Sequence, residues 1–188
     1  MTCIVGVARD KTVFIGGDSL ATDSASLAKT LRADPKVFVK DGMIIGFCGS
    51  FRMGQIIRYA FKTPARPKSV SDLEYLIGTW VPALIDCFDK QGYSGDKPAE
   101  SKDESKVGGN FLLGYKGVLY EIEDDYQVGI PMDNYASVGC GRELAMGSLF
   151  TSLRNPETDP KDIIGVALEA AEAFSAGVQK PFVILESK

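Results

Sequence analysis

Short apolar runs separated by turn residues dominate the first quarter of the sequence. One pair of runs covers residues 2–7 and 12–17, and a second pair covers 36–39 and 43–48, with Asp41-Gly42 between the members of the second pair. An Asp-Gly dipeptide between apolar runs is a strong signal for a tight hairpin turn. This quarter is therefore predicted to form two antiparallel hairpins.

Helical periodicity and further strands alternate along the rest of the chain. Apolar residues recur at helical spacing over 51–61, and Ser71-Asp72-Leu73-Glu74 is a capping box that opens a second helix, which Pro82 is expected to kink. Asp159 is a predicted N-cap followed by proline at the first helical position. The pattern also predicts a hairpin at 110–115 and 118–122, strands at 135–138 and 182–185, and helices at 143–153 and 160–174.

This order of elements predicts an α+β fold. It fits a four-layer αββα sandwich, in which two antiparallel sheets pack face to face and a helix pair covers each outer side. Residues 1–188 are expected to form a single domain, because this length and an apolar content of 45% suffice for one core. Residues 91–108 are polar and lack periodicity, so we expect a mobile surface loop there.

Composition excludes several classes of partner. A net charge of −4 without basic stripes argues against nucleic acid, and no apolar run is long enough to cross a bilayer. The start of the chain has no signal-peptide pattern, so a cytoplasmic location is expected. No cofactor, metal site or disulfide is expected either, because the cysteines are widely spaced and none forms a Cys-x-x-Cys pair: Cys3, Cys48, Cys87 and Cys140.

The sequence contains no histidine. This excludes Ser-His-Asp and Cys-His mechanisms and removes the commonest general base at neutral pH. Thr2 offers another solution if Met1 is removed, which the small size of Thr2 permits to a methionine aminopeptidase. An N-terminal threonine carries both a nucleophilic hydroxyl and an α-amine, whose pKa of about 8 suits a base near neutral pH.

Several segments resemble, in order and spacing, the proteasome β subunits and the bacterial HslV peptidase. They are residues 2–7, 17–22, 36–38, 46–49 and 139–141. The resemblance implies the N-terminal nucleophile hydrolase fold and a cytoplasmic threonine endopeptidase that assembles as a homo-oligomeric ring. It further implies peptides or unfolded proteins as substrates, and it leaves open the ring size and whether an ATPase unfoldase feeds the ring.

The resemblance also assigns catalytic roles. Thr2 would be the nucleophile, and Asp18 and Lys36 would form an ion pair beside it, where the ammonium lowers the pKa of the hydroxyl. The connection before Lys36 is slightly longer than in the relatives. Lys29 and Arg32 therefore remain competitors for the role of the cation.

Three further positions are implied to contact the substrate. Gly49 matches a glycine whose backbone N–H stabilises the oxyanion, and a glycine also lets the substrate backbone approach closely. Phe47 would line the specificity pocket. Thr22 would hydrogen-bond the substrate backbone as an added strand.

Two departures from the family pattern concern the surroundings of the amine. Cys140 stands where the family has a serine in a Gly-Ser-Gly turn, and a thiol is a weaker hydrogen-bonding group. Ala173 and Ala176 stand where relatives carry an aspartate and a hydroxyl residue, and Glu172 or Ser175 would substitute if the helix register differs by one.

The sequence therefore leaves hypotheses from two classes open. The first is an active threonine peptidase, supported by Thr2, Asp18, Lys36 and Gly49. The second is a proteasome-like assembly protein that keeps the fold but has lost the peptidase site. A third hypothesis, an amidase of the same superfamily with Cys3 as nucleophile, requires the removal of two residues.

Overall fold

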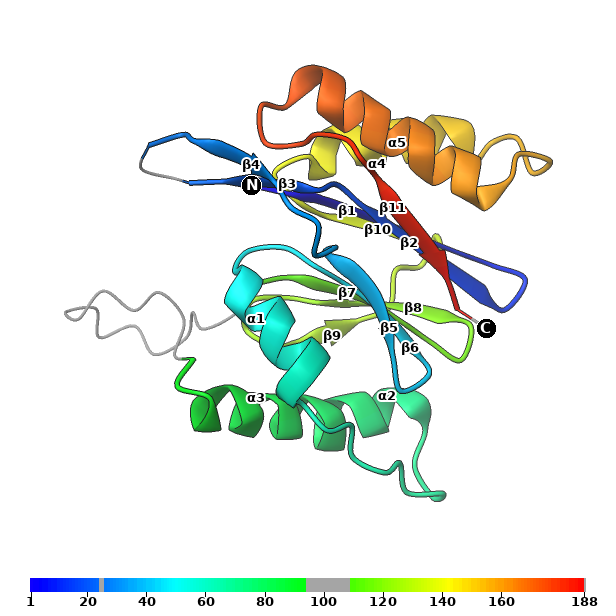
Figure 1. Cartoon of the computed structure of the whole chain (residues 1–188). Helices are drawn as coiled ribbons and strands as arrows, with labels where there is room; N and C mark the ends of the chain where they lie inside the picture. The colour runs from blue at the N-terminus through cyan, green and yellow to red at the C-terminus, as the bar shows by residue number, and fades with distance from the viewer. Residues whose placement is uncertain (24–25, 94–108, 188) are drawn as a thin grey trace.

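The computed structural model describes residues 1–23, 26–93 and 109–187, and it consists of four layers (Figure 1). Helices α4 (Arg142–Ser152) and α5 (Pro160–Phe174) cover one outer side, and two sheets lie face to face beneath them. Helical segments from the middle of the chain cover the opposite side. The predicted αββα sandwich is confirmed.

The sheet under α4 and α5 has four antiparallel strands in the order β10-β1-β2-β11. Its strands are β1 (Cys3–Arg9), β2 (Thr12–Gly17), β10 (Tyr135–Gly139) and β11 (Val183–Glu186). The first strand lies inside the sheet. Both ends of β1 are therefore fixed by neighbours, including the end next to Thr2.

The second sheet has five antiparallel strands in sequence order. They are β5 (Val37–Lys40), β6 (Met43–Phe47), β7 (Phe111–Tyr115), β8 (Val118–Ile122) and β9 (Val128–Gly129). Asp41 and Gly42 have φ of 49° and 77°, as a two-residue hairpin turn with positive φ at both central positions requires. The predicted hairpins β1–β2, β5–β6 and β7–β8 are confirmed.

The helical layer on the second sheet contains π-helical turns. Its segments are α1 (Phe51–Gln55), η1 (Ile56–Ala60), α2 (Asp72–Tyr75), η2 (Leu76–Trp80) and α3 (Val81–Lys90). The capping box is present, because Ser71 Oγ accepts from Glu74 N at 3.2 Å and Glu74 Oε2 accepts from Ser71 N at 2.7 Å. Pro82 is the second residue of α3, directly after the π-helical turn η2. Proline has no backbone N–H to donate to the preceding helical turn, and the change to π-helical hydrogen bonding in η2 accommodates it.

The core between the sheets is apolar and tightly packed. A Cβ on Gly46 would lie 2.5 Å from Ile4 Cγ2, so only glycine permits the sheets to approach this closely. Buried side chains from both sheets fill the space: Ile4, Val13, Ile15, Val37, Ile44, Leu112, Leu119 and Val138. This packing holds β6 directly under the start of β1.

The structure contains one hairpin that the sequence pattern does not indicate. Strands β3 (Leu20–Thr22) and β4 (Lys29–Leu31) pair with each other, and no hairpin was predicted in this connection. Of the loop expected at 91–108, the structure describes only the turn at 91–93 that ends α3, and the remainder lies outside the described residues.

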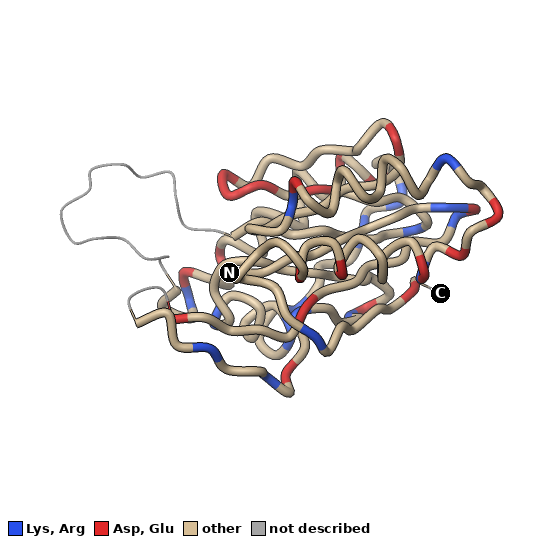
Figure 2. The backbone as a smooth tube through the Cα atoms, turned by 90° about the horizontal axis from the view of Figure 1, so that it is seen from above, with Lys and Arg blue, Asp and Glu red and all other residues tan. Residues whose placement is uncertain are grey.

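Charged residues are distributed over both sides of the molecule. Figure 2 shows Lys and Arg positions interspersed with Asp and Glu positions along the chain. Within the described ranges, no helix is both long and apolar enough to span a membrane.

Candidate active site

The end of the sandwich at which the chain begins brings together segments that are far apart in the sequence. Thr2 immediately precedes β1 and is 3% exposed, and Cys3 pairs with Gly139 of β10. Asp18 follows β2 directly, and its backbone N–H donates to the Cys3 carbonyl at 3.3 Å. The antiparallel register of β1 with both neighbours therefore places Thr2 beside the ends of β2 and β10.

A buried ion pair joins Asp18 to Lys36 at this end. Lys36 Nζ lies 2.8 Å from Asp18 Oδ1, and the two side chains are 1% and 0% exposed. The ammonium also donates to the Leu20 carbonyl at 2.7 Å, and the carboxylate accepts from Cys3 N and from Leu20 N, each at 3.0 Å. Such a pair tolerates burial only because neighbouring groups satisfy its remaining lone pairs and protons.

Burial shifts the protonation equilibria of two side chains here. It lowers the pKa of Lys36 below the usual lysine value, and the charge of Asp18 partly opposes this shift. It raises the pKa of the Cys3 thiol to about 12, so this thiol stays protonated at neutral pH. Cys3 is also 0% exposed, which argues against a nucleophilic role for it.

The Thr2 hydroxyl and the Lys36 ammonium converge on one oxygen atom. Thr2 Oγ1 donates to the Met1 carbonyl at 2.5 Å, and Lys36 Nζ lies 3.5 Å from the same carbonyl oxygen. With Met1 in place, the Thr2 nitrogen is a peptide N–H, and it donates to Cys140 Sγ at 3.2 Å. Removal of Met1, which is 46% exposed, would turn this nitrogen into an α-amine next to the hydroxyl.

Of the cations considered from sequence, Lys36 is the one that contacts Asp18. Arg32 instead forms a bidentate pair with Asp34, through Nε at 2.8 Å and Nη2 at 2.6 Å. This guanidinium holds the pKa of the Asp34 carboxyl below its usual value. Lys29 lies on the exposed strand β4 and lines a separate groove.

Gly49 lies in the turn between β6 and α1. Its φ of +102° disfavours any side chain, and a Cβ there would lie 3.2 Å from Gly109 Cα. The neighbouring Cys48 packs against β10, because a Cβ on Gly139 would lie 3.5 Å from Cys48 Cβ. Gly49 is thus at the same end of the sandwich as Thr2.

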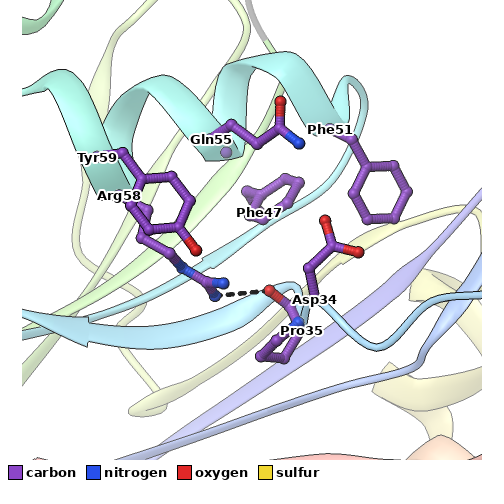
Figure 3. Close-up of a pocket in the computed structure, with 8 residues that line it drawn as sticks. Asp34, Pro35, Phe47, Phe51, Gln55, Arg58 and Tyr59 are labelled. Carbon is purple, nitrogen blue, oxygen red and sulfur yellow. Dashed lines mark hydrogen bonds between the residues drawn. The ribbon is translucent and has the colours of Figure 1, made fainter.

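A small pocket lies beside the ion pair (Figure 3). Phe47 lies at its centre, and the ring packs so closely on α1 that a Cβ at Gly54 would be 2.2 Å from Phe47 Cζ. The Phe51 and Phe47 rings pack edge to face, with their centroids 5.9 Å apart. The centroid of the Phe51 ring is 5.8 Å from Lys36 Nζ. About 10 Å³ of free space remains among the lining residues, which are Asp34, Pro35, Phe47, Phe51, Gly54, Gln55, Arg58 and Tyr59.

Most of these lining residues escaped the sequence analysis, which named only Phe47. Phe51, Gln55 and Arg58 follow one another at helical spacing just after Gly49, and this spacing could have indicated a shared face. Asp34 enters the pocket from the connection after β4, and no pattern in the sequence indicates that placement. Thr22 lies on β3, and its Oγ1 is buried without a hydrogen-bond partner within the described part of the chain.

The surroundings of the Thr2 nitrogen are built from the end of α5 and the turn after β10. An open groove of about 620 Å³ includes Ala173, Ala176 and Glu172 among its lining. Glu172 Oε1 accepts from Lys180 N at 2.8 Å, whereas Ser175 Oγ lies 3.8 Å from Cys140 Sγ. Of the two substitutes considered from sequence, Ser175 is the one in contact with the cysteine that touches Thr2.

No protein-family model and no curated protein matches the sequence. Solved structures nevertheless share the fold. BPH of Thiobacillus denitrificans superposes with a TM-score of 0.80 at 16% identity, and the match covers 98% of this chain and 97% of that one. HslV of Trypanosoma brucei superposes with a TM-score of 0.67 at 17% identity, and the match covers 98% of both chains. Anbu of Yersinia bercovieri superposes with a TM-score of 0.66 at 12% identity, and the match covers 98% of this chain and 81% of that one. The chain therefore has the N-terminal nucleophile hydrolase fold of proteasome-like proteins.

Proposed function

We propose that this chain is a threonine-type endopeptidase subunit, with Thr2 as its nucleophile after removal of Met1. The main support is that the Thr2 hydroxyl and the buried Lys36 ammonium both contact the Met1 carbonyl oxygen. The fold agrees with this proposal, and one of the similar structures, BPH, was solved in complex with epoxomicin. The proposed substrates are peptides and unfolded polypeptides.

In the proposed reaction the free Thr2 amine takes the proton of its own hydroxyl, directly or through a water molecule. The oxygen attacks the scissile carbonyl, the C–N bond breaks, and the leaving amine takes up the proton while an ester to Thr2 forms. Water then hydrolyses the ester with the same amine as base. Lys36 stabilises negative charge on the Thr2 oxygen, and the Gly49 N–H would stabilise the oxyanion.

Phe47 and Phe51, which borders the Lys36 ammonium, would contact the substrate side chain before the scissile bond. The lining side chains would move apart to admit it, because about 10 Å³ of free space holds no more than one water molecule. Thr22 on β3 would hydrogen-bond the substrate backbone as an added strand. The Asp18–Lys36 pair would stay fixed throughout, since backbone groups hold both partners.

Thr2→Ala is expected to lower hydrolysis of a fluorogenic peptide panel by at least about a thousandfold, because it removes the nucleophile. Folding should be preserved, since only a hydroxyl and a methyl group are lost. Thr2→Ser is the matched control, because it keeps the hydroxyl and should retain measurable activity. Comparable rates for Thr2→Ala and the wild type, both with Met1 removed, would contradict the proposal.

Lys36→Met removes the ammonium but keeps a side chain of similar length. Peptide hydrolysis should be lost, and the free energy of unfolding should fall by about 3–5 kcal/mol, because Asp18 is left charged and buried. Lys90→Met removes an exposed cation and should leave the denaturation midpoint nearly unchanged.

Adding Asp18→Asn to Lys36→Met separates stability from catalysis. The double variant removes the unpaired charge, so chemical denaturation should show stability partly restored while hydrolysis stays absent. Recovery of hydrolysis together with stability would show that Lys36 supports the fold only.

We further propose that the protein acts in the cytoplasm as a homo-oligomeric ring. The chain exposes large apolar side chains on both helical layers, including Phe174 at 80% and Tyr59 at 76%, and burial against further copies would remove them from water. Native mass spectrometry is expected to show a defined multiple of the single-chain mass. A single-chain mass at micromolar concentration would contradict the ring.

One observation favours the second candidate function, an assembly protein without peptidase activity. Alanine at 173 and 176 supplies no carboxylate to the Thr2 nitrogen, and Glu172, the last acidic residue of α5, accepts from Lys180 N. This candidate requires the ring but neither Met1 removal nor hydrolysis. Mass spectrometry of the N-terminus therefore separates the two, because the peptidase requires a Thr2 terminus.

A further inference from the structure

We propose that Gly109 is a positioning residue for the reaction and that it acts through the Cys48 carbonyl, which fixes the direction of the Gly49 N–H. This inference rests on the proposed function, in which that N–H stabilises the oxyanion. It identifies what holds the oxyanion donor in place, and it gives a role to a buried glycine that lies just before β7.

The Cys48 carbonyl points at Gly109. A Cβ on Gly109 would lie 2.0 Å from the Cys48 oxygen and 3.1 Å from the Cys48 carbonyl carbon. Because a C=O bond is about 1.23 Å long, these two distances place the carbon, the oxygen and the added atom roughly in line. The carbonyl is thus directed at the Cα of Gly109, with room between them only for a hydrogen atom.

The direction of this carbonyl determines the direction of the Gly49 N–H. The two groups belong to one trans peptide unit, which is planar and carries its C=O and N–H on opposite sides. Cys48 N donates to the Asn110 carbonyl at 3.0 Å, on the β7 side of β6, whereas Phe47 N donates to the Lys36 carbonyl at 3.1 Å, on the β5 side. The Gly49 N–H is therefore turned away from β7 and toward the side on which Lys36 lies.

Space, and not backbone conformation, requires a glycine at position 109. Gly109 is not among the described glycines that have positive φ, in contrast to Gly49 with a φ of +102°. A side chain would therefore suit the backbone at 109, but its first carbon would collide with the Cys48 oxygen. The collision is relieved only if the peptide tilts or the start of β7 moves away, and either change releases the unit that carries the Gly49 N–H.

Contacts on two sides hold Gly109 against this carbonyl. Gly109 N donates to Sδ of the fully buried Met53 on α1 at 3.2 Å. Asn110 Nδ2 donates to Glu123 Oε2 at 2.5 Å, which ties the next residue to the end of β8. Because α1 begins soon after Gly49, the helix that follows the oxyanion donor also holds the residue that orients this donor.

A role in packing alone is the competing explanation, and the two explanations differ in what an added methyl group changes. If Gly109 serves packing only, Gly109→Ala lowers the melting temperature and leaves kcat of the folded protein intact. If Gly109 positions the donor, kcat falls while KM stays the same, because an oxyanion donor acts on the transition state and not on the bound substrate.

The test compares Gly109→Ala, Met53→Leu and the control Gly78→Ala in protein whose Met1 is removed. Gly78 is exposed, and outside its own helical turn no described part of the chain lies within 4 Å of a Cβ there. Gly109→Ala is expected to lower kcat for peptide hydrolysis about a hundredfold, near the effect of removing one oxyanion donor, with KM unchanged.

The other two variants bracket this effect. Met53→Leu keeps the volume of the side chain but removes the acceptor of the Gly109 N–H. Its kcat should fall about threefold to tenfold, the equivalent of one neutral hydrogen bond. Gly78→Ala should leave both kcat and KM unchanged.

Calorimetric binding of a peptide aldehyde and of the matching peptide alcohol isolates the oxyanion interaction without hydrolysis. Thr2 Oγ1 bonds to the aldehyde carbon, the C=O π pair moves onto its oxygen, and the hydroxyl proton passes to the Thr2 amine. The alcohol binds the same subsites without this step. The preference for the aldehyde, expressed as a ratio of Kd values, should fall at least about tenfold in Gly109→Ala and about threefold in Met53→Leu.

An unchanged aldehyde preference or an unchanged kcat in folded Gly109→Ala overturns the inference and leaves the proposed function intact. If Gly109→Ala does not fold, Met53→Leu decides by the same two measurements. A wild type that neither hydrolyses peptides nor prefers the aldehyde contradicts the proposed function, and this inference with it.

Discussion

The buried ion pair between Lys36 and Asp18 is the constraint on which the arrangement of this site depends. Two charges can be withdrawn from water only if each remaining donor and acceptor has a partner. Here the partners are backbone groups of Cys3 and Leu20, so the pair fixes the start of β1 against the start of β3. The nucleophile candidate, one residue before Cys3, is therefore held by the same bonds that make the buried charge tolerable.

Glycines extend this constraint from one ion pair to the whole end of the sandwich. Gly46 lets β6 approach β1, Gly139 lets the end of β10 approach the Thr2 carbonyl, and Gly177 lets the turn after α5 reach Met1 and Cys140. Each of these approaches leaves no room for a side chain. Segments from the beginning, middle and end of the chain consequently meet around Thr2.

The fold was largely predictable because its signals are local. Alternating apolar runs, the Asp41-Gly42 turn and the caps at Ser71 and Asp159 each specify an element without reference to the rest of the chain. The β3–β4 hairpin was not predicted because each strand has only three residues and Leu20 is the one buried residue among them, so no alternation of apolar and polar positions marks it.

The site was predictable only in part, because most of its contacts join residues that are far apart in the sequence. A resemblance in spacing selected Asp18 and Lys36, but only the structure distinguishes Lys36 from Arg32, whose guanidinium is bound to Asp34. The positions of Asp34 and Arg58 in the pocket, and of Ser175 beside Cys140, depend on side chains that meet across the fold. No periodicity in the sequence encodes such meetings.

The central claim is that Thr2, once it is the first residue, is a nucleophile with its own amine as base. Its most direct test is incubation with epoxomicin, a threonine-directed epoxyketone, followed by mass spectrometry of the N-terminal peptide. One covalent adduct is expected on Thr2, present only in chains that have lost Met1. A chain with a verified Thr2 terminus that forms no adduct, or an adduct found only on a cysteine such as Cys140, would contradict it.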